Sequence, residues 1–180
     1  MEKPASYCAF VAKLPVSNVH RVYHDTQYGF AVESDDELFG RLILEINQAG
    51  LSWDTILNKQ RHFRKAYDGY DLQRVAVYGD ADVGRLMSDA GIVRNRLKIH
   101  AAIFNAQKIL ELQSESGSFR NWLSNQEHLD IRDWVALFKR TFKFTGGEIT
   151  KEFLMSTGHI PGAHVEGCPL YGAGSELQSM

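Results

Sequence analysis

An acidic residue stands inside an apolar run at residues 42–53, which read LILEINQAGLSW. At about 100° per residue along a helix, Glu45 lies at the edge of the apolar face, beside Leu38 and Ala49. One interpretation is a carboxylate that reaches solvent or pairs with an arginine, because an unpaired glutamate is almost never buried. The other is a carboxylate that lines a pocket and meets a cationic or hydrogen-bond-donating ligand there.

Trp53 follows the same run directly after a turn. An indole is a good stacking surface for a flat ring, and its electron-rich face attracts cations. Trp53 could equally belong to the ordinary core. If Glu45 and Trp53 share one pocket, the ligand would be flat and either positively charged or rich in hydrogen-bond donors.

The two cysteines of the chain each have a histidine at a spacing that could bind a metal ion. His164 and Cys168 form an H-x3-C pair near one end, and Cys8 precedes His24 near the other end. Two thiolates and two imidazoles make a closed tetrahedral set that suits structural zinc. Such a site would hold the two ends of a helical domain together. The alternative is two buried thiols and two surface histidines.

Residues 86–98, LMSDAGIVRNRLK, predict a helical hairpin with a turn at Gly91 and basic residues after it. The first amides of a helix lack partners and the helix dipole favours an anion there, so this turn could hold one DNA phosphate. A second glycine, usual in such turns, is missing, and a plain helix–turn–helix with a solvated basic face is the alternative. The residues expected to contact the DNA backbone are Gly91, Ile92, Val93, Arg94, Arg96 and Lys98.

Helical periodicity dominates the elements that must position these residues, and alternation with period two is scarce. Ser34 to Glu37 predict a capping box that opens a helix ending near Gly50. Ser52 is expected to cap the next helix, which turns Trp53, Ile56, Leu57, Phe63 and Ala66 inward. Further helices are expected at 72–78, 80–89, 94–114, 118–125, 130–141 and 148–157. In the 94–114 helix the expected inward residues are Leu97, Ala101, Phe104, Ile109 and Leu112. The sequence therefore predicts an all-α protein.

The composition fits one domain spanning residues 1–180. The chain is 44% hydrophobic and has a net charge of −2, so a nucleic-acid partner would have to use a local basic patch. An 18-residue apolar stretch and a signal-peptide pattern are both absent, and we expect a cytoplasmic monomer with no membrane contact.

Several stretches together resemble the bacterial 3-methyladenine DNA glycosylase I family of the helix–hairpin–helix superfamily. They occur in the family's order and cover most of the chain. They are VYHDTQYGF (22–30), ELFGRLILEINQAGLSW (37–53), DAGIVRNRLKIHA (89–101), FKFTGG (142–147) and HVEGC (164–168).

This resemblance implies a base-excision repair enzyme with the helix–hairpin–helix glycosylase fold. It would flip 3-methyladenine out of alkylated duplex DNA and cleave the glycosidic bond. Glu45 would hydrogen-bond the flipped base as the catalytic residue, and Trp53, Tyr23 and Phe10 would bind the base. The resemblance also implies that structural Zn²⁺ is bound by four residues of this chain. They are Cys8, His24, His164 and Cys168.

The chemistry expected of Glu45 follows from the charge of the substrate. Methylation at N3 makes adenine cationic in DNA, so the base is already a good leaving group. A carboxylate can favour the cationic base and the oxocarbenium-like charge that develops on the sugar. Residues 105–115, NAQKILELQSE, lack the aspartate that many relatives of the superfamily carry beyond the hairpin. We therefore expect a monofunctional enzyme that uses water as its nucleophile.

The chain departs from the family's pattern at several positions, which leaves base preference open. Phe10 stands for a tryptophan, Gln27-Tyr28 for Glu-Trp, Gly147-Glu148 for a Pro/Thr-Thr pair, Lys151 for a tyrosine and Met155 for a glutamine. One extra residue precedes His164. The late helix also gains charge through Glu148, Lys151 and Glu152. Two other functions remain open: a non-catalytic, zinc-stabilised module that binds damaged or bent DNA, and a helical interaction protein with no role on DNA.

Overall fold

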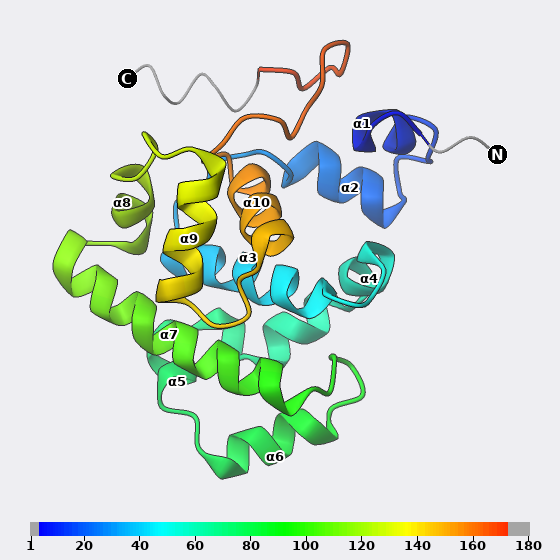
Figure 1. The fold of residues 1–180 in the computed structure, drawn as a ribbon. Helices are drawn as coiled ribbons and strands as arrows, with labels where there is room; N and C mark the ends of the chain where they lie inside the picture. The colour runs from blue at the N-terminus through cyan, green and yellow to red at the C-terminus, as the bar shows by residue number, and fades with distance from the viewer. Residues whose placement is uncertain (1–3, 173–180) are drawn as a thin grey trace.

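The computed structural model describes residues 4–172, and over that range the chain forms helices and no strand (Figure 1). The all-α prediction is confirmed for these residues, whereas 1–3 and 173–180 of the predicted domain lie outside them. In chain order the elements are α1 (Tyr7–Val11), α2 (Val19–Thr26), α3 (Asp35–Gln48), α4 (Trp53–Ala66), the 3₁₀ turn η1 (Asp68–Tyr70), α5 (Leu72–Ala76), α6 (Asp80–Ser88), α7 (Arg96–Ser116), α8 (Phe119–Ser124), α9 (Ile131–Thr141) and α10 (Gly147–Ser156).

Helix α3 lies in the middle of the molecule, with α5 and α7 on one side and α10 on the other (Figure 1). Ser34 caps it, because its hydroxyl accepts a hydrogen bond from the Glu37 amide at 3.4 Å. The other half of the predicted capping box is not formed, because the Glu37 carboxylate pairs with Arg64 on α4. Almost every side chain from Leu38 to Asn47 is buried. Glu45 therefore lies on a helix that is covered on all sides, and the predicted edge of an apolar face does not exist there.

The acidic residues of the first turn of α3 also fix two neighbouring helices. The Asp35 carboxylate accepts hydrogen bonds from the Phe119 and Arg120 amides at 2.7 and 3.0 Å, at the start of α8. The Asp36 carboxylate accepts one from the Leu72 amide at 3.1 Å, at the start of α5. These bonds satisfy amides that the receiving helices cannot satisfy themselves. One short acidic run thus caps α3 electrostatically and orients α5 and α8 around it.

The predicted helices from residue 34 onward are confirmed, with small differences at their ends. Helix α7 begins at Arg96 rather than 94, since the Asn95 side chain caps it by accepting a hydrogen bond from the Lys98 amide at 3.2 Å. Two of the residues expected to face inward on α7 do not: Leu97 is 67% exposed and Phe104 is 37% exposed. The buried face is set by Ile99, Ala102, Ile103, Ala106 and Ile109.

Periodicity missed α1, α2 and η1, because none of them is long enough to show a convincing repeat. Helix α2 did carry a start signal in Asn18, whose side chain accepts a hydrogen bond from the His20 amide at 2.9 Å. Helices α1 and α2 lie at one end of the molecule, where the segment after α10 returns to meet them (Figure 1).

No helix within residues 4–172 combines the length and the apolar character that crossing a bilayer requires.

Candidate active site and metal cluster

Glu45 is a buried carboxyl group that has no neutralising partner within residues 4–172. Its side chain is on α3, and the residue is 5% exposed. Within the part of the chain that the structure describes, its carboxyl forms neither a hydrogen bond nor an ion pair, and its interactions are purely electrostatic. A buried carboxylate left in this state is costly, which is typical of a group that meets a ligand.

The surroundings of Glu45 favour the protonated form. Its pKa is raised to about 8, first by burial and then by the negative charge of Glu152, while the guanidinium of Arg41 partly opposes the shift. The interpretation of Glu45 as a solvated edge carboxylate is therefore wrong. Glu152, on α10, was not among the predicted site residues, although the extra charge of its helix is visible in the sequence.

Aromatic side chains gather beside Glu45. Tyr23, on α2, interacts electrostatically with Glu45, and its ring lies 5.3 Å from that of Trp53 in an edge-on arrangement. Trp53 is the first residue of α4 and remains partly exposed, with Ser52 capping the helix before it. Tyr28 lies 5.7 Å from Tyr23, ring to ring. The structure thus brings the predicted pair Tyr23 and Trp53 together, and Tyr23 also interacts with Glu45.

Arg41 lies one helical turn before Glu45 on α3 and contacts the same cluster. Its guanidinium donates a hydrogen bond to the Gln27 carbonyl oxygen at 3.2 Å and a long one to the Tyr23 hydroxyl at 3.5 Å. It also lies 5.5 Å from the centre of the Tyr23 ring. Arg41 was not among the predicted site residues, because an arginine at this spacing is common on any helix.

Phe10 lies farther from this cluster than predicted. Its ring is 6.2 Å from that of Tyr7 and 5.3 Å from that of His20. Tyr7 contacts both Phe10 and the cluster, because its ring is 5.3 Å from that of Tyr28 and its hydroxyl is 3.0 Å from the His20 Nδ1 atom. Tyr7 is therefore the aromatic residue of α1 that reaches the cluster, and no motif in the sequence pointed to it.

The four predicted metal ligands come together. The donor atoms of Cys8, His24, His164 and Cys168 all lie within 4.8 Å of one another. The His24 Nε2 atom is 3.4 Å from the Cys8 sulfur and 3.2 Å from the His164 Nδ1 atom. The Cys168 sulfur is 3.8 and 3.7 Å from those two nitrogens. In a tetrahedral zinc site with Zn–N about 2.0 Å and Zn–S about 2.3 Å, neighbouring donors lie roughly 3.3–3.8 Å apart.

Both histidines are oriented by hydrogen bonds on their other ring nitrogen. The His24 Nδ1 atom is 2.7 Å from a carboxylate oxygen of Asp25, and the His164 Nε2 atom is 2.8 Å from the Tyr28 carbonyl oxygen. Each acceptor places the proton on the nitrogen that faces away from the cluster and leaves the other free to bind a metal. The arrangement fits a metal ion, and it links α1 and α2 to residues 164–168. The outer partner Asp25 was missed, although it follows His24 directly.

The predicted hairpin joins α6 to α7 through residues 89–95. The Gly91 amide donates to the Asp89 carboxylate at 2.7 Å, and the Ile92 amide donates to the Asp89 carbonyl at 3.4 Å. A Cβ atom on Gly91 would lie 2.9 Å from the His62 ring, so close approach to α4 is what requires glycine here. Two of the expected phosphate-binding amides are thus used inside the turn. The side chain of Ile92 is buried in the core, whereas Arg94 and Arg96 are exposed.

Lys98 has a different position from the one predicted. It is 6% exposed, and its ammonium group donates hydrogen bonds to the carbonyl oxygens of Asn47 and Ala49 at 3.2 and 2.8 Å. These carbonyls belong to the C-terminal end of α3, where a positive charge is favourable. Lys59, which was not predicted, donates from α4 to the Ala90 and Gly91 carbonyls at 3.0 and 3.2 Å. These two lysines tie the hairpin to α3 and α4.

Comparison with known proteins gives a consistent set of relatives. The model of the methyladenine glycosylase family matches residues 14–134. DNA-3-methyladenine glycosylase 1 of Escherichia coli (strain K12) is 32% identical over 183 residues, which cover 91% of this chain and 96% of that protein. DNA-3-methyladenine glycosylase of Haemophilus influenzae is 30% identical, with coverage of 82% and 89%.

A similar structure is that of 3-methyladenine DNA glycosylase I from Staphylococcus aureus, described as the structural basis of 3-methyladenine recognition. It superposes with a TM-score of 0.80 at 30% identity and covers 93% of this chain and 97% of that one. The stretch matched by the family model includes Tyr23, Glu45, Trp53 and the hairpin. The chain therefore belongs to the methyladenine glycosylase family.

Proposed function

We propose that this protein is a monofunctional DNA glycosylase that flips 3-methyladenine out of alkylated duplex DNA and hydrolyses its N-glycosidic bond. The observation that carries the proposal is Glu45, a buried carboxyl group with no hydrogen bond or ion pair in residues 4–172. Tyr23 contacts the ring of Trp53 and interacts electrostatically with Glu45. The membership of the chain in the methyladenine glycosylase family supports the same activity.

Glu45 would act on the charge of the substrate. Because 3-methyladenine is cationic in DNA, the enzyme need not protonate the leaving base. The pKa of about 8 leaves Glu45 largely protonated in the free protein at neutral pH. A cationic base beside it favours the ionised form, so the carboxyl proton would be lost to water as the base arrives. The resulting carboxylate would stabilise the positive charge that moves from the base to the sugar.

Trp53 and Tyr23 would bind the flipped base. A flat purine can stack on an indole, and such stacking adds free energy without reading sequence. Tyr23 would line the site beside Trp53 and near Glu45. Phe10 would contribute indirectly, through its contact with Tyr7.

The hairpin would hold the DNA backbone. We assign direct phosphate contact to the exposed side chains of Arg94 and Arg96, and to the amides that follow Ile92 at Val93 and Arg94. Gly91 would act by allowing the hairpin to approach α4. Lys98 would position α3 rather than touch DNA.

The metal cluster would hold structural Zn²⁺ between Cys8, His24, His164 and Cys168. The donor set and the outer hydrogen bonds from Asp25 and Tyr28 support zinc over a hard cation. When bound, the ion would cross-link distant parts of the chain and would take no part in hydrolysis. The protein would work as a monomer, which stays a prediction.

Chromatography of bases released from alkylated duplex DNA tests this function. We expect the wild-type protein to release 3-methyladenine. A module that only binds damaged DNA would shift the same DNA in a gel without releasing any base, and that result would overturn the proposal.

A further inference from the structure

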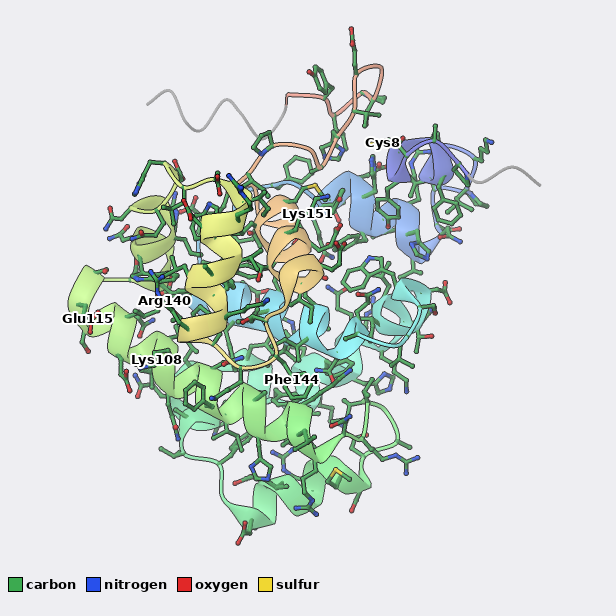
Figure 2. All side chains as sticks on the ribbon, viewed as in Figure 1. Cys8, Lys108, Glu115, Arg140, Phe144 and Lys151 are labelled. Carbon is green, nitrogen blue, oxygen red and sulfur yellow. The ribbon has the colours of Figure 1, made fainter. Side chains whose placement is uncertain are left out.

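A second acidic residue, Glu152, faces the same site from α10. It lies three residues before Met155 and therefore on the same side of the helix. Met155 is buried against Tyr23 and Tyr28, in a cluster that also includes Leu57. Helix α10 packs against α3, and Lys151 marks its position in Figure 2, between α9 and α2.

Glu152 interacts with the site residues rather than with a partner of its own. Of the charges around Glu45, Glu152 is the one that opposes ionisation most. Glu152 also acts on Tyr28, whose pKa is raised above its usual range mainly by burial. Both acidic groups, from two helices, therefore act on Tyr28, which packs with Tyr23 and Met155.

Within the described residues, neither carboxyl group is paired with a basic side chain. Glu152 is half-buried and forms no hydrogen bond or ion pair with any residue in the 4–172 range. Lys151, the preceding residue, is exposed. Its positive charge favours the ionised form of Glu152 electrostatically, without an ion pair between the two side chains. Arg41 is close to Glu45, but its guanidinium is engaged with Gln27 and Tyr23.

Ionising Glu45 near the acidic Glu152 is unfavourable in the free protein, and a cation bound near both groups would relieve that cost. A neutral ligand of the same shape would gain nothing from the second group. The second carboxyl thus favours one class of ligand, a flat organic cation.

We propose that Glu152 is a specificity-determining residue of this enzyme, which acts with Glu45 to select positively charged alkylated purines over uncharged ones. The inference rests on the proposed function for the identity of the ligand. It adds a second acidic residue, from the charged late helix, to the site built around Glu45.

Binding of two related small molecules separates charge from shape. The first probe is 3,9-dimethyladeninium, which carries a permanent positive charge. The second is 3-methyladenine at pH 8, where the free base is uncharged. Calorimetric titration of the wild type and of Glu152→Gln gives a dissociation constant for each probe.

We expect Glu152→Gln to weaken binding of the permanent cation by about tenfold and to leave the uncharged base within about twofold. The matched control is Glu148→Gln, which removes an exposed carboxylate one turn earlier on α10 and should leave both constants within about twofold. Loss of affinity for both probes equally would give Glu152 a role in shape only and would overturn the inference. Unchanged affinity for the cation would overturn it as well.

A double-mutant cycle with Glu45→Gln tests whether the two groups act together. Non-additive losses of cation affinity support joint action, whereas additive losses would contradict it. Release of 3-methyladenine from DNA by the wild type is measured in parallel. A wild type that releases no base speaks against the proposed function. A wild type that releases the base, together with a Glu152→Gln variant that binds both probes equally less tightly, speaks against this inference alone.

Discussion

Glu45 destabilises the fold of the free protein, and the same property suits it to bind a cationic ligand. The residue is buried and interacts electrostatically with Tyr23, and protein hydrogen bonds do not stabilise its charge in the described part of the chain. A carboxyl needed only for structure would be paired, because pairing lowers the cost of burial. The free energy that Glu45 costs the free protein is available again when a cation binds beside it.

The destabilisation of the folded protein by the buried Glu45 should increase as the pH rises. Its pKa is raised from 4.5 to about 8 in the folded protein, so folding favours the protonated form. The stability that this provides is fully present below about 4.5 and is lost as the pH rises through 8. We therefore expect Glu45→Gln and the wild type to have similar free energies of unfolding near pH 4.5. Near pH 9 the variant should be more stable by on the order of 2–4 kcal/mol.

Urea unfolding of both proteins from pH 4.5 to 9 measures this difference. Glu152 and Asp36, whose pKa values are also raised, are present in both proteins. Taking the difference therefore isolates Glu45 and its coupling to Glu152. A difference in the free energy of unfolding that stays the same at all pH values would show that Glu45 is not buried as described.

Trp53 should contribute to base binding more than to stability. The residue opens α4, is partly exposed and contacts Tyr23 with the edge of its ring. We expect Trp53→Ala to weaken binding of free 3-methyladenine by about 1–3 kcal/mol, as for other bases stacked on aromatic residues. Isothermal titration calorimetry, which does not rely on tryptophan fluorescence, measures the affinity. An unchanged affinity, together with a large drop in melting temperature, would place Trp53 in the core instead.

At the scale of elements, the hairpin combines exposed arginines with a buried lysine that the sequence does not tell apart. Arg94 is solvent-exposed, whereas Lys98 caps the carbonyl end of α3. We expect Arg94→Met to lower the slope of log affinity against log salt for duplex DNA by about 1 and to leave stability nearly unchanged. Lys98→Met should lower stability by about 1–3 kcal/mol, because two carbonyls lose their donor.

DNA titrations at several salt concentrations and urea unfolding of both variants separate these effects. Lys139→Met, an exposed lysine on α9, is a suitable control for the loss of one positive charge. A salt slope that falls for Lys98→Met but not for Arg94→Met would reverse the assignment of the two residues.

Long helices were predictable at this scale because their caps and periodicity are local. Ser34, Ser52 and Asn95 each cap the helix that follows. The positions of single side chains were less predictable. Leu97 and Lys98 are neighbours in one turn, and the apolar residue is exposed while the charged one is buried. This inversion depends on the carbonyl end of α3, which is remote in the sequence and leaves no trace near residue 98.

At the scale of the whole molecule, the metal cluster joins segments that are far apart in the chain. Cys8 and Cys168 are separated by most of the sequence, yet both sulfurs face His24. The spacing of the ligands allowed the cluster to be predicted as a set. Tyr7, Arg41 and Glu152 could not be predicted in the same way, because each reaches the site only through the packing of α1, α3 and α10.

The cluster should stabilise the fold through zinc. We expect Cys168→Ser to lower both the zinc content and the melting temperature, since a lost thiolate weakens metal binding and metal binding is linked to folding. Metal analysis and thermal unfolding of protein purified without chelator measure the two quantities. The matched change Ser124→Ala, far from the cluster on α8, should alter neither. Wild-type protein with almost no zinc would contradict the assignment of the metal.

The central claim is that Glu45 stabilises the charge that develops as the base leaves. Single-turnover release of 3-methyladenine from alkylated duplex DNA, by the wild type and by Glu45→Gln, tests it most directly. We predict release by the wild type and a rate at least about a hundredfold lower in the variant, as for other groups that stabilise charge in the transition state. DNA affinity should be retained in the variant. Equal rates in the two proteins would contradict the claim.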